Sequence, residues 1–289
     1  MTALVELARA KVNLTLAVCG RRPDGYHELD SLVAFADVAD DLRLEPGVGF
    51  TLSAEGPFAS AIEGENLIAK AVRLLQEADG RLATGRFHLT KRLPVAAGIG
   101  GGSADAAAAL RLVRQANPAR AHAIDWHDIA RRVGADVPVC LEARAQRLQG
   151  IGERLSPVPA LPAVAVLLAN PRIPLATADV FRALAASQVG RAAAGNGPRL
   201  PPAFRDPDHL IDWLMSGRND LEPAALRICP AISQVIARLA ALPGARLVRM
   251  SGSGPTCFAV FASLTQARQA EAKLALAEPQ WWTAAATLR

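Results

Sequence analysis

The chain has 289 residues, 51% of them hydrophobic, which suffices for one or two domains, and no apolar run is long enough to cross a membrane. Its four cysteines form no CxxC pair, and its first residues lack the basic start, apolar block and cleavage site of a secretory signal, so we expect a cytoplasmic protein. The net charge of +5 invites a nucleic-acid partner, but only 4% of the residues are aromatic, the basic residues are scattered and no recognised binding motif occurs.

The first predicted element is a strand over residues 11–18, because apolar and polar residues alternate there with the period of a strand that has one buried face. Lys11 and Asn13 share its polar side. That side is either the solvated face of an edge strand or a place where two functional groups project together, and the segment alone leaves both alternatives open.

A turn follows at Pro23, Asp24 and Gly25, because proline presets φ and glycine accepts a positive φ. The chain's one tyrosine, Tyr26, and His27 come directly after it. On local grounds this pair closes a hairpin.

The next predicted elements are a strand over residues 42–52 and a helix whose apolar stripe runs from residue 67 to residue 75. Asn66 is placed to cap the amino terminus of this helix, and Gly80 is placed to end it.

The stretch from Lys91 to Leu110, KRLPVAAGIGGGSADAAAAL, predicts the end of a strand, a glycine-rich loop and a helix that begins at Ser103. Its clustered glycines let backbone amides approach a ligand, and the first amides of the helix have no partner inside it. Together with the helix dipole, these amides favour a phosphate group over the alternative, a flexible turn before a surface helix. Ser103 is either the N-cap or a hydroxyl donor to the same phosphate.

Two common phosphate-binding motifs do not fit this loop. A Walker A loop needs Gly-Lys followed by Ser or Thr, and the chain has no such sequence. The dinucleotide fingerprint needs a third glycine where this chain has Ser103, and the acidic residue expected about 20 positions later is missing.

A short amphipathic helix is predicted to end at Gly134, and Asp136 follows it, before a proline and an apolar strand. On local grounds Asp136 is a solvated turn residue. Residues 147–155 predict a hairpin that links the two halves of the chain, and residues 163–170 predict a strand.

In the remaining chain, Thr177 is placed to cap a helix that carries Phe181, and a loop rich in Gly and Pro is expected over residues 187–208. A helical pattern begins in NDLEPAAL, residues 219–226, and residues 248–261 predict two strands joined by a glycine loop.

Several of these stretches resemble the GHMP kinases. Residues 94–104 resemble the second motif of that family, and Gly252 and Gly254 resemble its third. The blocks AKVNLTLAV and GRRPDGYHELDSLV resemble the amino-terminal signature of one branch, which acts on 4-diphosphocytidyl-2-C-methyl-D-erythritol in the non-mevalonate isoprenoid pathway. The segment GADVP is similar to the one that carries the family's second catalytic residue.

The resemblance implies roles for individual residues. Lys11 and Asp136 are expected to be catalytic, with Asp136 as the base assisted by Lys11. The residues expected to bind the substrate are Asn13, Tyr26, His27, Asp136, Thr177 and Phe181, and an aromatic face with an imidazole suits a planar base. The residues expected to bind ATP are Asn66, Leu67, Lys91, Pro94, Val95, Ala96, Ala97, Gly98, Ile99, Gly100, Gly101, Gly102, Ser103 and Ala104.

The implied fold is α+β: the two-domain GHMP kinase fold, with an ATP-binding half over residues 1–155 like domain two of ribosomal protein S5, and a ferredoxin-like half over residues 156–289. The implied activity is ATP-dependent phosphorylation of the 2-hydroxyl of the cytidyl substrate, with Mg²⁺. We expect no nucleic-acid or membrane partner, and a monomer or a weak homodimer. The alternatives are a GHMP kinase for homoserine or mevalonate, which would lack the Tyr-His signature, and a non-enzymatic nucleic-acid-binding protein.

Overall fold

The computed structural model describes residues 2–187 and 197–289, and the chain divides into two compact units. The first unit contains Met1–Ala10, Val38–Val95 and Gly100–Ala143, and the second contains Lys11–Asp37, Ala96–Ile99 and Arg144–Arg289. Strands β1 (Leu4–Asn13) and β3 (His27–Glu45) each contribute residues to both units. The domain boundary expected at residue 155 stays a prediction.

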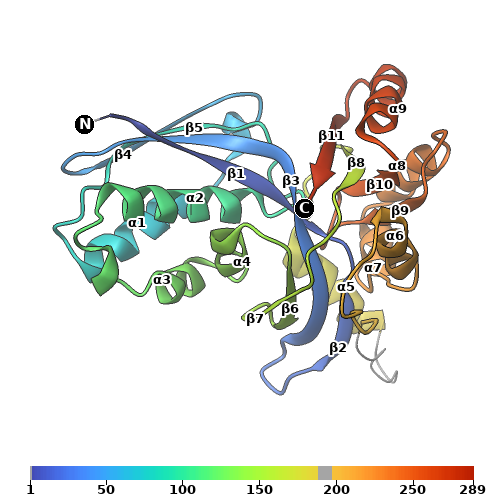
Figure 1. Ribbon diagram of the computed structural model, residues 1–289, viewed down its shortest axis with the longest axis horizontal. Coiled ribbons are helices and arrows are strands. Elements are labelled where there is room, and N and C mark those ends of the chain that lie inside the picture. The colour runs from blue at the N-terminus through green and yellow to red at the C-terminus, as the bar shows by residue number, and fades with distance from the viewer. Residues whose placement is uncertain (1, 188–196) are drawn as a thin grey trace. The chain divides into compact units, whose positions relative to one another are not determined.

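In the first unit, helices pack on a small sheet. Strand β4 (Phe50–Glu55) pairs in parallel with β5 (Gly85–Thr90), and β5 pairs antiparallel with the last residues of β3. Figure 1 shows the helices on one side of these strands: α1 (Leu67–Ala78), α2 (Gly101–Ala116), α3 (Trp126–Val133) and α4 (Val137–Glu142). The buried alanines of α2 let it pack closely against both α1 and α4. Short 3₁₀ turns lie at Ala59–Ala61 and Ala121–Ala123.

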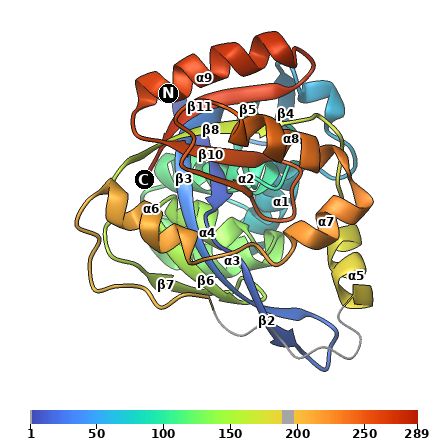
Figure 2. The ribbon, with the colours of Figure 1, turned by 90° about the vertical axis from the view of Figure 1, so that its right-hand side faces the viewer.

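In the second unit, an antiparallel sheet runs in the order β11, β8, β10, β9. These strands are β8 (Val164–Asn170), β9 (Leu247–Met250), β10 (Cys257–Phe261) and β11 (Trp282–Leu288). Figure 2 shows α8 (Ala231–Ala240) and α9 (Leu264–Ala277) beside this sheet, and both pack on it. The remaining helices of the unit are α5 (Thr177–Ser187), α6 (Pro207–Met215) and α7 (Glu222–Ile228), of which α5 and α7 pack on each other.

In the second unit, two strands from different hairpins pair with the same strand, β3. Strand β2 (Ala17–Arg21) pairs antiparallel with the start of β3, and the turn between them holds residues 22–26. Strand β6 (Gln146–Gly150) pairs with β3 as well, and then with β7 (Arg154–Pro157). The turn that carries Tyr26 and the turn between β6 and β7 are therefore held by one strand.

Several predicted elements are confirmed. The hairpin over residues 147–155, the strand over 163–170 and the strands within 248–261 are present. Asn66 caps α1, because its Oδ1 atom accepts a hydrogen bond of 2.8 Å from the amide of Ile68. Helix α3 ends before Gly134, and α1 ends at Ala78 with Asp79 as its C-cap and Gly80 directly after it, as predicted.

Other predicted elements are wrong. The apolar run after Asp136 is not a strand but the helix α4, since a run of six residues is too short for periodicity to separate the two. Residues 42–52 form the end of β3, a turn and the start of β4, because Pro46, Gly47 and Gly49 interrupt the strand. Residues 11–18 are buried on both faces and are divided between β1 and β2.

The loop expected over residues 187–208 is described only in part. Residues 197–206 contain no helix or strand, and α6 begins at Pro207 with Asp206 as its cap, while residues 188–196 lie outside the described residues. Within residues 2–187 and 197–289, no helix combines the length and the apolar character that crossing a membrane needs.

Candidate active site

The glycine-rich loop leads directly into helix α2. The helix begins at Gly101, two residues earlier than predicted, and its N-cap is Gly100 with a left-handed φ of 63°. Ser103 is therefore not the N-cap but the third helical residue, because three successive glycines let the backbone turn into the helix before it. The first intrahelical bond joins the amide of Ala104 to the carbonyl oxygen of Gly100 (2.8 Å), so the amides of residues 101–103 lie at the positive end of the helix.

In the second unit, residues 96–99 of this loop pack against residues 251–256, which form the glycine loop between β9 and β10. The Ala97 carbonyl accepts a hydrogen bond from the Thr256 amide (3.2 Å), and the Gly98 carbonyl accepts one from the Ser251 hydroxyl (3.1 Å). A Cβ atom at Gly98 would lie 2.6 Å from the Gly254 carbonyl oxygen, so only glycine fits this contact. The two loops therefore hold each other's backbone in place.

Lys11 and Asn13 belong to a buried chain of hydrogen bonds next to these loops. The Lys11 ammonium donates to Asn13 Oδ1 (3.0 Å), and Asn13 Nδ2 donates to the Ser31 hydroxyl (2.8 Å). Their backbone is fixed as well, because the Lys11 amide donates to the Ile99 carbonyl (2.9 Å) and the Asn13 amide donates to Ser251 Oγ (3.1 Å). Lys11 and Asn13 do project together, as the sequence alternation allowed, but from a buried face.

Sequence reasoning missed two residues that support this arrangement. Ser251 bridges Asn13 and Gly98, while Asn219 donates from Nδ2 to the carbonyl oxygens of Met250 (2.8 Å) and Gly252 (2.9 Å). Ser251 could have been found from the sequence, because it lies between Met250 and Gly252 in a motif to which only the glycines were assigned. Nothing local to Asn219 points to partners more than 30 residues away in the chain.

The residues predicted to bind a planar base also lie in the second unit. The imidazole of His27 is 7% exposed and stacks on the ring of Phe181 from α5, with ring centroids 5.3 Å apart. Burial and, secondarily, the nearby Arg21 charge lower the pKa of His27, and its Nε2 atom has no hydrogen-bond partner among the described residues. Tyr26 is 61% exposed at the end of the turn.

Thr177 is the first residue of α5 rather than its cap, since the amides of Asp179 and Val180 bond to the Ala176 carbonyl. Its hydroxyl instead shares a hydrogen bond of 2.8 Å with the hydroxyl of Ser253 in the glycine loop. Thr177 is thus tied to the same loop that supports Gly98.

In the first unit, Lys91 is buried between two carboxylates. Its ammonium donates to Asp40 and to Asp105, each at 2.6 Å, and Asp40 also accepts from the amides of Arg92 and Leu93. Burial is the largest influence on Asp105 and raises its pKa to about 7, although the Lys91 charge acts in the opposite direction. This cluster joins β3, the entrance of the glycine-rich loop and α2, so the side chain of Lys91 anchors the loop from the protein side.

Asp136 precedes α4 and lies in a segment that is fastened on both sides. The Lys70 ammonium of α1 donates to the Val133 carbonyl (2.8 Å), and Arg111 of α2 donates to the Cys140 carbonyl (2.8 Å). The backbone carbonyl of Asp136 accepts from the Cys140 amide (3.2 Å). These contacts fix the backbone that carries the Asp136 carboxyl group.

The structure thus brings predicted residues together within each unit. The second unit gathers Lys11 and Asn13 with residues 96–99, and His27 with Phe181. The first unit holds Asn66, Lys91 and Asp136, and the side chain of Leu67 approaches Gly102. No group of three or more His, Cys, Asp or Glu side chains that could hold a metal ion occurs among the described residues.

A mutually supported pair of glycine loops, one entering a helix, is the arrangement expected of a GHMP kinase. The family models agree: GHMP kinases N terminal domain matches residues 66–144, and GHMP kinases C terminal matches residues 202–279. The chain is therefore a GHMP kinase, with the α+β GHMP kinase fold that the sequence predicted, and this class implies ATP as the phosphoryl donor.

The relatives place the chain within this class. A 4-diphosphocytidyl-2-C-methyl-D-erythritol kinase of Rhodopseudomonas palustris is 50% identical over 291 residues, covering 99% of this chain and 97% of the relative. The kinase of the same name from Nitrobacter hamburgensis is 50% identical over 293 residues, covering 99% and 96%. A crystal structure of 4-(cytidine 5'-diphospho)-2C-methyl-D-erythritol kinase superposes with a TM-score of 0.79 at 37% identity, covering 99% of both chains. The chain belongs to the 4-diphosphocytidyl-2-C-methyl-D-erythritol kinase family.

Proposed function

We propose that this protein transfers the γ-phosphoryl group of ATP to the 2-hydroxyl of 4-diphosphocytidyl-2-C-methyl-D-erythritol, giving the 2-phosphate and ADP. The observation that carries the choice of substrate is the buried imidazole of His27, which stacks on Phe181 and has an Nε2 atom without a described partner. A buried polar atom of this kind costs free energy unless a ligand satisfies it. A cytosine ring offers both the hydrogen-bonding edge and the flat face that this place requires.

The residues present fit the triphosphate of ATP. Residues 101–103 offer helix amides that precede the first intrahelical bond, and Gly98 and Gly100 adopt left-handed conformations that bring backbone close to a ligand. The proposed nucleotide site consists of the loop from Pro94 to Ala104, with Asn66 and Leu67 at the start of α1 and Lys91 as the anchor of the loop.

We propose Mg²⁺ as the cofactor, held mainly by the phosphate oxygens of ATP. The described residues contain no cluster of three or more acidic, histidine or cysteine ligands, which fits an ion that keeps its waters and binds through the nucleotide. When bound, the ion offsets the negative charge of the phosphates.

Asp136 and Lys11 carry the proposed chemistry. Asp136 accepts the proton of the attacking hydroxyl, and its backbone is fixed by the contacts of Lys70 and Arg111 described above. Lys11 stabilises the negative charge on the transferring group, and its hydrogen bond to Asn13 holds the ammonium in one direction. Asn13 orients the alcohol, and Thr177 supports the substrate side of the glycine loop.

We further propose that the protein works in the cytoplasm as a monomer or a weak homodimer, with no nucleic-acid or membrane partner. Supporting this, Arg22, Arg73, Arg86 and Arg120 each pair with a carboxylate of the same chain, which reduces the cationic surface available to a polyanion.

The test is ADP release by the purified protein with ATP and Mg²⁺, using the cytidyl alcohol, its counterpart without the CMP moiety, mevalonate and homoserine as acceptors. Turnover with the cytidyl alcohol alone is expected. Turnover with mevalonate or homoserine would keep the phosphate loop but reject the cytosine site, and no turnover with any acceptor would reject the kinase.

The catalytic roles predict large effects of small substitutions. Asp136→Asn and Lys11→Ala are expected to lower kcat on the order of a hundredfold or more, the usual scale for a positioned acid or base. Steady-state kinetics with the cytidyl alcohol measure this, and thermal unfolding checks that each variant is folded. An Asp136→Asn variant with near-native kcat would remove Asp136 as the base.

A further inference from the structure

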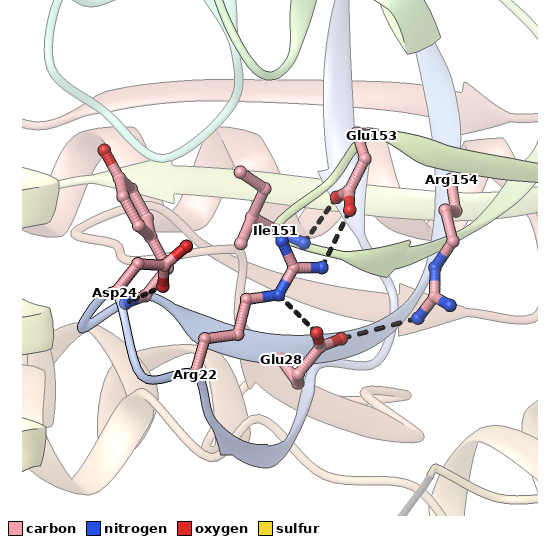
Figure 3. Close-up of polar contacts among 7 residues, drawn as sticks. Arg22, Asp24, Glu28, Ile151, Glu153 and Arg154 are labelled. Carbon is pink, nitrogen blue, oxygen red and sulfur yellow. Dashed lines mark hydrogen bonds and ion pairs between the residues drawn. The ribbon is translucent and has the colours of Figure 1, made fainter.

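The turn that carries Tyr26 is linked to a second hairpin by a chain of alternating charges. Figure 3 shows Arg22 and Glu28, from the β2–β3 hairpin, facing Glu153 and Arg154, from the β6–β7 hairpin. Arg22 pairs with Glu28 and, at 2.8 Å, with Glu153, while Glu28 also pairs with Arg154 at 3.4 Å. We call these four residues the hairpin clasp. Because two positive and two negative charges alternate, its internal charge is balanced.

The backbone of Arg22 brackets the turn that its side chain fastens. The Arg22 amide donates to the Tyr26 carbonyl (2.7 Å), and the Gly25 amide donates to the Arg22 carbonyl (3.0 Å). Inside the turn, Asp24 accepts from the Tyr26 amide (3.1 Å). The Arg22 side chain therefore joins this turn to Glu28 of β3 and to Glu153 of the β6–β7 hairpin.

At the other end of the clasp, neighbouring backbone holds the Glu153 carboxylate in place. The Glu153 carboxylate accepts a hydrogen bond from the Ile151 amide (2.5 Å), and a Cβ atom at Gly150 would clash with Glu153 Oε2. Gly150, with a φ of 73°, is thus the residue that leaves room for this carboxylate. Burial acts to raise the pKa of Glu153, but the hydrogen bonds from Arg22 and from backbone amides outweigh it and keep the pKa below its ordinary value.

The geometry points to Arg22 and Glu153 as positioning residues that hold the Tyr26–His27 turn in the conformation that receives the cytosine of the substrate. This inference rests on the proposed function, since it assigns the turn to substrate binding. In this role, neither side chain contacts the substrate. The clasp acts on binding of the cytidyl alcohol and leaves ATP binding and the chemical step alone.

The expected result is a change in KM rather than kcat. Arg22→Gln and Glu153→Gln are each expected to raise the KM for the cytidyl alcohol about fivefold, the scale of a lost exposed ion-pair network, while kcat and the KM for ATP stay within about twofold. Arg154→Gln, which removes only the outer pair, is expected to have a smaller effect. Arg238→Gln, which removes the ion pair between Arg238 on α8 and Glu278 at the end of α9, is the matched control and should change nothing.

A second readout does not depend on activity. Tyr26 is the only tyrosine of the chain, so protein made with 3-fluorotyrosine has a single fluorine label, located in the turn. In the ligand-free state, the ¹⁹F resonance is expected to shift or broaden in Arg22→Gln and in Glu153→Gln, but not in Arg238→Gln. Addition of cytidine 5'-monophosphate should shift the resonance of the unmodified chain at lower concentration than in the two clasp variants.

Three results would overturn the inference. An unchanged KM and an unchanged ¹⁹F resonance in Glu153→Gln would show that the clasp does not position the turn. A raised KM in Arg22→Gln with none in Glu153→Gln would make Arg22 a direct substrate contact. A fall in kcat at constant KM would place the effect in the chemical step. Failure of the proposed function appears separately, as no turnover of the unmodified protein with the cytidyl alcohol, and leaves the ligand-free fluorine comparison intact.

Discussion

Asp105 is a carboxyl group whose ionisation the fold opposes. It is 4% exposed, its Oδ2 atom accepts from Lys91, and its Oδ1 atom has no partner among the described residues. Asp40 presents a second carboxylate to the same ammonium. One buried cation therefore serves two carboxylates, and burial raises the pKa of Asp105 to about 7.

This raised pKa predicts the pH dependence of stability. Between the ordinary aspartate pKa of about 4 and a folded-state pKa of about 7, the unfolded chain has released the Asp105 proton while the folded chain retains it, so stability falls as pH rises through this window. Asp105→Asn has no proton to lose. As pH rises from 5 to 8, the Tm of the unmodified protein is expected to fall relative to the Tm of Asp105→Asn, by on the order of 5 °C. Thermal unfolding at each pH measures both values.

The control for this comparison is Asp41→Asn, because the Asp41 side chain is 32% exposed and pairs with Arg92 at the surface. Its Tm difference from the unmodified protein should stay constant over the same pH range. A constant difference for Asp105→Asn as well would mean that Asp105 is ionised throughout and that the Lys91 charge outweighs burial.

At the scale of elements, the glycine loop between β9 and β10 supports the glycine-rich loop before α2 through backbone contact. Gly252 has a φ of 54°, and a Cβ atom there would lie 2.9 Å from the Gly98 carbonyl oxygen and 3.1 Å from Asn13 Oδ1. Gly252→Ala must therefore displace the loop or the residues it touches. We expect it to lower kcat/KM by on the order of tenfold, because small misplacements of positioning groups are costly.

Gly244→Ala separates this effect from backbone strain. Gly244 also has a positive φ, of 85°, but its Cβ atom would meet nothing closer than 3.6 Å. In thermal unfolding, both variants should lose roughly 1 kcal/mol of stability, the cost of a left-handed conformation for a residue with a side chain. Gly252→Ala should lose more than Gly244→Ala, because its Cβ atom also meets the Gly98 carbonyl oxygen. Equal kinetic losses in both would show that the contact with Gly98 does not matter for catalysis.

The sequence predicted elements where the signal is local. The Asn66 cap, the glycine-rich loop and the hairpin over residues 147–155 depend on residues that are neighbours in the chain. The helix at Val137–Glu142 was mistaken for a strand because six residues make less than two helical turns.

The supporting contacts of the site could not be predicted in the same way. Ser251 reaches Asn13 across 238 positions and Gly98 across 153, and Lys91 meets Asp40 across 51. Pairings over such separations are set by the tertiary fold, and no spacing within one segment encodes them. Family resemblance supplied the expected roles of Lys11, His27 and Asp136. Local patterns left Lys11 open between structure and function, and they favoured a purely structural place for His27 and for Asp136.

At the scale of the whole molecule, the chain has a net charge of +5, and the contacts of its arginine side chains decide how much of the positive charge is available to a partner. Internal pairing uses much of it: Arg147 binds the Asp30 carboxylate with both Nε and Nη2, and Arg111 is held by Glu6 and by backbone carbonyls. Arg249 is buried and donates to the carbonyls of Leu14, Leu214 and Gly217. Guanidinium groups committed in this way are not available to release counterions from a nucleic acid.

For the whole molecule we therefore predict that a nucleotide, but not RNA, stabilises the folded protein against unfolding. Because the proposed site for ATP with Mg²⁺ exists only in the folded chain, a concentration of about 100 times the Kd is expected to stabilise the protein by about 2.7 kcal/mol. Differential scanning fluorimetry should record this as a rise in Tm. Adenosine, which lacks the phosphates that the glycine-rich loop is proposed to bind, should give a much smaller rise at the same concentration. Single-stranded RNA at an equal phosphate concentration in 150 mM salt should give none. RNA binding with a steep salt dependence, together with no Tm shift from ATP, would favour the nucleic-acid-binding alternative. Electrostatic contacts with a polyanion weaken as the salt concentration rises, whereas a nucleotide site binds a single ATP molecule at a defined position.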